Sequence, residues 1–328
     1  MSALISVVKN SKWIDLSPKH KELREFLEKF MTDPNKIVMI KGAFGIGKTN
    51  TLHYLFHYGW CKLKTPVHYV SLEKLYPILE KYANEKAEKK IGNVELCDFI
   101  DKKVKSTLSA IENDTPNEDT NLFFFDWEMG NLSDLCKGFS PLILEQFVDN
   151  KLVTEQFNLL TPEIIKESIQ SKHRPLLLID EFETKFTKLK SLVDASNGGE
   201  LRELFDQVVE KKVSFDLMIG NGPASGYELK SENSKGTDDA ESSRIIPKQV
   251  PFPLPESTQE FLGTSNKGLL NFAWWASRCR ARHFLRLKDA VGNLETLSLK
   301  KSYAEFLSDF TFFSDPIESS EEGQSPIT

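Results

Sequence analysis

The sequence predicts an α/β protein in which helices cover both faces of a central parallel sheet, followed by a small all-helical domain. Short apolar runs, typical of buried strands, alternate with amphipathic helical stretches along the first 250 residues. Strands separated in this way by helices favour a parallel sheet. After the proline-rich segment 251–255 the apolar spacing is helical to about residue 313. We therefore expect a core at 1–250, a helical domain at 251–313 and a disordered acidic tail at 314–328.

The composition excludes several classes of protein. The chain has 328 residues, 40% of them hydrophobic, and a net charge of −6, with 42 Lys and Arg against 48 Asp and Glu. This balance gives no overall positive field that would attract nucleic acid or anionic lipid. No apolar run has the roughly 18 residues of a membrane span, and the first residues lack a signal-peptide layout. The four scattered cysteines favour reduced thiols. We expect a cytoplasmic chain without membrane contact.

In the first half of the predicted sheet, glycine and proline residues separate the expected helices and strands. Apolar residues at helical spacing predict a helix over 18–31, and the run 36–40 predicts a short buried strand. A glycine-rich turn and a helix over roughly 48–58 follow. A second strand is predicted at 67–72, directly after Pro66.

An insertion of about 85–172 separates this second strand from the third. Within it, the polar, proline-broken residues 113–121 predict a surface linker, and 162–171 has a helical pattern. Beyond the insertion we expect, in chain order, a strand at 176–179, a helix at 200–211, a strand at 215–219 and a last strand near 250–252.

Residues 42–49 read GAFGIGKT and fit the pattern G-x-x-x-x-G-K-[ST] at every fixed position. The glycines let the backbone curl so that its N–H groups point at phosphate oxygens, and the following helix adds its positive N-terminal end. Lys48 would place its ammonium on the β- and γ-phosphates, and Thr49 would give its hydroxyl to Mg²⁺. The candidate nucleotide-binding residues are Gly42, Ala43, Phe44, Gly45, Ile46, Gly47, Lys48, Thr49 and Asn50.

A second chemical motif is the apolar strand that ends in Asp180-Glu181. A carboxylate at the end of a buried strand suits a Mg²⁺ site beside a phosphate loop, which makes Asp180 a metal-ligand candidate together with Thr49. Glu181 is placed to orient and deprotonate an attacking water. The alternative for this pair, taken alone, is an exposed acidic turn.

Two single residues are weaker candidates. Asn221 ends the strand 215–219, where its amide would hydrogen-bond a γ-phosphate or the attacking water. The alternative is a turn residue that tolerates a left-handed backbone. Arg244 precedes the expected last strand and would reach a nucleotide held by a neighbouring subunit; the alternative is a solvated surface arginine.

The helical domain contributes a basic stripe. Arg278, Arg282 and Arg286 recur every four residues within 271–288 and therefore lie on one helix face. Arg278 or Arg282 would bend over the γ-phosphate from a lid, or the stripe would contact a nucleic-acid backbone. The alternative is a solvated, salt-bridged helix face.

Taken in order, these motifs resemble an AAA+ P-loop ATPase, of the broad group that contains the origin-recognition initiators and related archaeal and bacterial ATPases. The resemblance spans about residues 18–313 and implies a three-layer αβα core with a helical lid, ATP and Mg²⁺ as cofactors, and self-association through an inter-subunit nucleotide site. It assigns the first sensor to Asn221 and the inter-subunit arginine to Arg244. Few residues follow residue 313, which leaves no room for the winged-helix DNA reader of the initiators.

The leading hypothesis is an Mg²⁺-dependent ATPase whose nucleotide state controls assembly or binding of a protein or DNA partner. Glu181, Lys48, Asn221, Arg244, Arg278 and Arg282 are its candidate catalytic residues. One alternative is a switch or scaffold that binds ATP and hardly hydrolyses it. Others are a DNA-binding module that uses the 278–286 helix, and a small-molecule kinase. The kinase is disfavoured because Glu181 directly after Asp180 favours water as the nucleophile.

Overall fold

The computed structural model divides the chain into two compact units, Met1–Pro253 and Leu254–Thr328. The residues that the structure describes are 17–34, 37–43, 45–86, 89–113, 115, 117–123, 162–182, 192, 208, 210–222, 245–252, 267, 268 and 271. Only three of these belong to the second unit, so the fold below is that of the first. The predicted helical domain and acidic tail lie almost entirely outside the described residues, as does most of the predicted helix 200–211.

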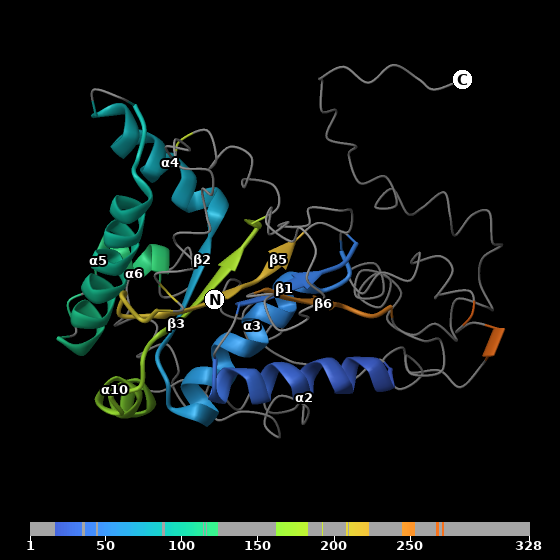
Figure 1. Ribbon diagram of the computed structural model, residues 1–328. Coiled ribbons are helices and arrows are strands. Elements are labelled where there is room, and N and C mark those ends of the chain that lie inside the picture. Colours follow the sequence, from blue (N-terminus) through green and yellow to red (C-terminus); the bar gives the residue numbers. More distant parts are fainter. Residues whose placement is uncertain are drawn as a thin grey trace, which may run out of the picture. The chain divides into compact units, whose positions relative to one another are not determined.

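Figure 1 shows the described helices and strands. The helices are α2 (Pro18–Thr32), α3 (Lys48–Tyr58), the π-helical turn η1 (Gly59–Leu63), α4 (Leu72–Asn84), α5 (Asn93–Glu112), α6 (Glu118–Phe123) and α10 (Pro162–Gln170). The strands are β1 (Ile37–Lys41), β2 (Val67–Ser71), β3 (Leu176–Asp180), β4 (Asp216–Ile219), β5 (Asn221–Gly222) and β6 (Ile245–Gln249). Along the described chain, helices alternate with β1 and β2, four helices lie between β2 and β3, and β4, β5 and β6 come after β3.

The strands form two parallel sheets of three, in the orders β5-β1-β6 and β2-β3-β4. Gly220 connects them, because it is the one residue between β4 and β5. Its N–H donates to the carbonyl oxygen of Ile179 at 3.0 Å, and its own carbonyl accepts from the N–H of Ile40 at 2.9 Å. The strands therefore follow one another as β2, β3, β4/β5, β1 and β6, and β4/β5 lies between β1 and β3.

Alternate residues of these strands pack into two separate hydrophobic clusters, one on each face. One cluster joins Leu176 and Leu178 of β3 to α2, α3 and α10, and the other joins Leu177 and Ile179 to α4, α5 and α6. Figure 1 shows α2 and α3 on one side of the strands and α4, α5 and α6 on the other. The expected α/β class with parallel strands is thus confirmed.

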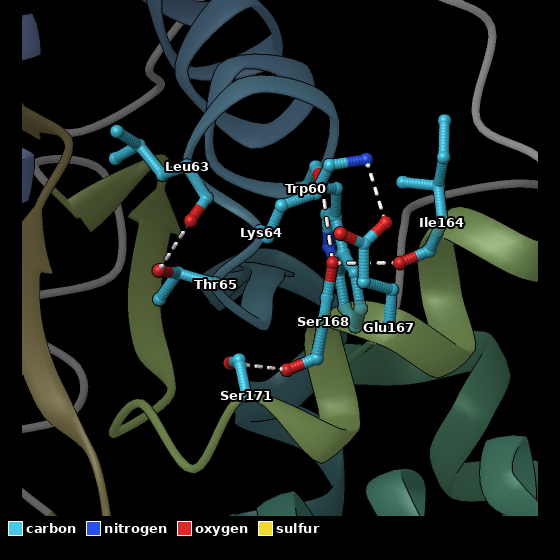
Figure 2. Close-up of polar contacts among 8 residues, drawn as sticks. All are labelled: Trp60, Leu63, Lys64, Thr65, Ile164, Glu167, Ser168 and Ser171. Atoms are coloured by element: carbon cyan, nitrogen blue, oxygen red, sulfur yellow. Dashed lines mark hydrogen bonds and ion pairs between the residues drawn. The ribbon is translucent and has the colours of Figure 1, made fainter.

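Helix α10 docks onto η1, where polar groups are buried between the two (Figure 2). The Ser168 hydroxyl lies 2.7 Å from the carbonyl oxygen of Ile164 and 3.3 Å from that of Trp60. The Trp60 indole N–H donates to the carbonyl of Val67 at 2.8 Å. Since buried polar groups are costly without partners, the bond from Ser168 to Trp60 helps to fix where the end of the insertion meets the core.

Two boundaries differ from those expected. Residues 118–121, predicted as linker, form the start of α6, because Asp119 pairs with Lys103 at 2.7 Å and Phe123 is fully buried against α5. The last strand among the described residues is Ile245–Gln249 rather than 250–252. It contains Pro247, which a strand tolerates where it pairs on one side only, and β6 pairs only with β1 among the described strands.

Within the described part of the chain, no helix combines the length and the apolar character needed to cross a lipid bilayer.

Replacing Gly220 by alanine tests the connection between the two sheets. A Cβ at this position would lie 2.3 Å from Cδ1 of Leu52 and 2.4 Å from the carbonyl oxygen of Ile179, so the backbone has to shift. We expect Gly220→Ala to lower the free energy of unfolding by about 2–3 kcal/mol. Urea unfolding measures this, with Gly92→Ala as the control, because a Cβ there meets no atom closer than 4.0 Å. Equal stability of the two variants would contradict the close packing described at Gly220.

Candidate functional site

The glycine-rich loop runs from the end of β1 to the start of α3. Gly45 and Gly47 have φ values of 75° and 112°, in the left-handed region that favours glycine. Gly47 is the N-cap of α3, and no side chain of a described residue caps this helix end. Because the first N–H groups of a helix have no acceptor within that helix, the start of α3 suits an anionic ligand.

The two polar side chains that follow the loop point to different partners. The ammonium of Lys48 donates to the carbonyl oxygen of Gly42 at 2.6 Å and contacts that of Ala43 at 3.4 Å, so the lysine folds back over its own loop. The hydroxyl of Thr49 donates to Oδ1 of Asp180 at 3.3 Å, although 131 positions separate the two residues. The loop and the acidic end of β3 therefore share one location.

Asp180 is buried, with 3% of its surface exposed, and three donors satisfy its carboxylate. Its Oδ1 accepts from the Thr49 hydroxyl and from the backbone N–H of Glu181, the latter at 2.9 Å. Its Oδ2 accepts from the phenol of Tyr69 at 2.6 Å. A buried carboxylate without such partners would be strongly destabilising, so these bonds are what allow it to lie here.

Glu181 lies beside a second carboxyl group. Its backbone has a positive φ of 56°, and its Oε2 accepts from the Ser71 hydroxyl at 3.3 Å. Burial raises the pKa of Glu181 to about 7, helped by a hydrogen bond to Glu73 and by the charges of Glu73 and Asp180, while the Ser71 bond opposes the shift. This pKa lies where a general base for reactions near neutral pH is most effective.

The remaining predicted residues are described in part or not at all. Asn221 pairs with Ile40 of β1, so its backbone lies at the same carboxyl edge of the strands as Asp180; the structure does not describe its side chain. Phe44, Arg244, Arg278, Arg282 and Arg286 lie outside the described residues.

The donors present fit a magnesium ion. Thr49 and Asp180 supply a hydroxyl and a carboxylate 3.3 Å apart, and Mg²⁺ characteristically takes one or two such protein oxygens and completes its shell with phosphate oxygens and water. In the described ranges no three His, Cys, Asp or Glu side chains form a cluster that would hold a metal by protein ligands alone. A site here would thus depend on a phosphate ligand.

Three residues that contact the acidic pair belong to no sequence motif and were not among the predicted site residues: Tyr69, Ser71 and Glu73. Tyr69 and Ser71 are two residues apart on β2, and Ser71 lies opposite Asp180 in the parallel register. Strand alternation predicts that Tyr69 and Ser71 share one face of β2. That this face lies beside Asp180 follows only from the pairing of β2 with β3. Glu73 lies in the first turn of α4, which begins directly after β2.

Comparison with known proteins identifies no relative. No protein-family model matches the chain, and searches of curated proteins and of solved structures also find no match. Function is therefore inferred from the geometry of this site.

Replacing Glu181 by glutamine tests whether burial beside other carboxyl groups raises the pKa of Glu181. Because its pKa is raised from 4.5 to about 7 in the folded chain, that chain holds the proton more tightly than the unfolded chain, and stability falls as pH rises between these values. Glutamine has no charge to bury. We expect Glu181→Gln to be more stable than the wild type by about 1–2 kcal/mol at pH 8, after allowance for solvent screening.

Urea unfolding at pH 8 and at pH 4 measures this difference, which should shrink towards zero at pH 4. The matched control is Glu22→Gln, since Glu22 is exposed on α2 and should show no pH-dependent gain. A Glu181→Gln protein no more stable than the wild type at pH 8 would contradict the raised pKa.

Proposed function

We propose that this chain is an Mg²⁺-dependent, ATP-binding and ATP-hydrolysing protein of the AAA+ type, whose nucleotide state controls assembly or partner binding. The observation that carries the proposal is the contact between Thr49 and Asp180. It brings together a glycine-rich loop, a lysine, a hydroxyl and a carboxylate, which are the groups that binding of a metal–triphosphate requires.

The strand order supports the same proposal. In the fold that the sequence resembles, the strand that ends in the first sensor lies between the loop strand and the acidic strand. Here β4/β5, which leads into Asn221, lies between β1 and β3. A residue at the end of that strand is next to both the loop and Asp180. The three-layer core with a helical lid remains part of the proposal.

Each residue then has a chemical role. The phosphates bind to the loop amides at the start of α3, and the Lys48 ammonium leaves the carbonyls of Gly42 and Ala43 to reach them. Thr49 and Asp180 would hold Mg²⁺, which would supply positive charge against the phosphates when bound. Glu181 accepts a proton from the water that attacks the γ-phosphate.

Two variants separate binding from hydrolysis. We expect Lys48→Ala to weaken ATP affinity at least tenfold, because it removes the ammonium that balances the phosphate charge. Glu181→Gln should still bind ATP but release phosphate about 100-fold more slowly, the usual cost of losing a general base. Isothermal titration and phosphate release measure the two effects, with Lys81→Ala on the exposed surface of α4 as the control.

Wild-type protein that binds no ATP in the presence of Mg²⁺ would overturn the proposal. Equal phosphate release by the wild type and Glu181→Gln would remove Glu181 from the mechanism while leaving nucleotide binding intact.

A slow switch is the second candidate function, and one observation favours it. The Glu181 carboxyl is held by the Ser71 hydroxyl at 3.3 Å, and burial, with Glu73 adding to the shift, raises its pKa to about 7. About half of the molecules therefore carry Glu181 protonated at pH 7, and only the other half have a base that can accept a proton from the attacking water. Tight ATP binding with negligible steady-state turnover would establish the switch.

Assembly is the part of the proposal that depends on Arg244. If this arginine reaches a nucleotide held by a neighbouring subunit, ATP with Mg²⁺ should raise the mass measured by light scattering, ADP should not, and Arg244→Ala should stay at the ADP mass. ATP-dependent assembly that is unchanged in Arg244→Ala would exclude this role for the residue.

A further inference from the structure

We propose that Tyr69 is a positioning residue for the carboxylate of Asp180, and that its phenol sets how tightly the site binds a divalent cation. This inference rests on the proposed function, since it concerns the same site. The residue is not part of the glycine motif or of the acidic motif, and its place in the fold comes from the neighbouring strand β2.

The phenol reaches Asp180 diagonally across two parallel strands. Tyr69 lies opposite Leu178 in the β2–β3 register, and Asp180 is two residues further along β3. Side chains two residues apart share a face, so Tyr69, Leu178 and Asp180 all lie on the α3 side of the sheet. A diagonal neighbour in a sheet is within reach of an aromatic side chain. The resulting bond, 2.6 Å to Oδ2, is short, as expected for a hydroxyl that donates to a charged oxygen.

The ring that carries this hydroxyl is held in place. Tyr69 is 2% exposed, and the imidazole of His53 packs edge-on against it with ring centroids 5.2 Å apart. His53 is four residues after Thr49 on α3, which is one helical turn, so both residues lie on the face that meets β2 and β3. Helix α3 therefore positions the Thr49 hydroxyl directly and supports the Tyr69 phenol indirectly.

The hydroxyls of Thr49 and Tyr69 donate to different oxygens of the Asp180 carboxylate. With Oδ2 bonded to Tyr69, the Asp180 carboxylate cannot rotate freely, and Oδ1 is kept towards Thr49, where the cation would bind. Without the phenol, Oδ2 loses this donor, and the carboxylate is held less firmly towards Thr49. Removing a partner that orients a metal ligand typically costs 10–100-fold in metal affinity.

A purely structural role for Tyr69 makes a different prediction. If the phenol only satisfies a buried oxygen, its removal lowers the stability of the whole chain and leaves the affinity of the folded protein for a cation unchanged. Metal affinity therefore separates the two roles, and hydrolysis rates are not needed.

The test compares Tyr69→Phe with Tyr82→Phe. The control removes a similar bond, since the Tyr82 phenol donates to a carboxylate oxygen of Glu95 at 2.7 Å between α4 and α5. Mn²⁺ is titrated into each protein in the presence of a saturating, non-hydrolysable ATP analogue, and free Mn²⁺ is followed by electron paramagnetic resonance. We expect Tyr69→Phe to bind Mn²⁺ about tenfold more weakly, at the low end of the roughly 10–100-fold loss typical for a partner that orients a metal ligand. Tyr82→Phe should match the wild type, and affinity for the analogue in EDTA should be the same for all three proteins.

The outcomes distinguish this inference from the proposed function. Wild-type protein that binds neither the analogue nor Mn²⁺ means that the proposed function has failed. Wild type that binds both, with Tyr69→Phe binding Mn²⁺ equally well, overturns the positioning role of Tyr69. If Tyr69→Phe does not fold, 4-aminophenylalanine is placed at position 69, since it keeps the shape and donates a weaker hydrogen bond. Weaker Mn²⁺ binding by this protein than by the wild type supports the inference, and equal binding overturns it.

Discussion

The burial of one carboxylate, that of Asp180, is the constraint on which the described site depends. The group is removed from water at the end of an apolar strand, so its charge has to be balanced by donors from elsewhere in the fold. Those donors come from the loop helix α3, from the next strand β2, and from the chain immediately after β3. Two segments that precede Asp180 by more than 100 residues, α3 and β2, therefore meet the end of β3 at this side chain. The continuity of the strands through Gly220 keeps the loop and Asp180 at one edge.

The same crowding of carboxyl groups lowers the stability of the folded chain. Glu181 lies close to both Asp180 and Glu73, and burial with these neighbours raises its pKa to about 7. Its backbone also adopts a left-handed conformation that costs free energy for a residue with a side chain. Neither feature improves packing. Both are understandable if the position is kept for the chemistry of the carboxyl group, since perturbed pKa values concentrate at functional sites.

Much of the fold was predictable because its signals are local. The apolar run after Pro175 defined β3, and the glycine spacing of residues 42–49 defined the turn between β1 and α3. What could not be predicted depends on which segments become neighbours. Helix α6 forms where the polar sequence indicated a linker, because α5 supplies partners for Asp119. Tyr69 gave no signal of its own, since a tyrosine in an apolar strand is usually a core residue. Its role emerges only when β2 is paired with β3.

The central claim is that Thr49 and Asp180 act together on one metal–nucleotide complex, and a double-mutant cycle on Mg²⁺-ATP affinity tests it most directly. Thr49→Val, Asp180→Asn and the double variant are each titrated with ATP in the presence of Mg²⁺ and again in EDTA. The account predicts that with Mg²⁺ the two substitutions are non-additive, by about 1 kcal/mol or more, as expected for residues that share one ligand, and that the coupling vanishes in EDTA. Strictly additive losses, or a coupling that is the same without the metal, would contradict it.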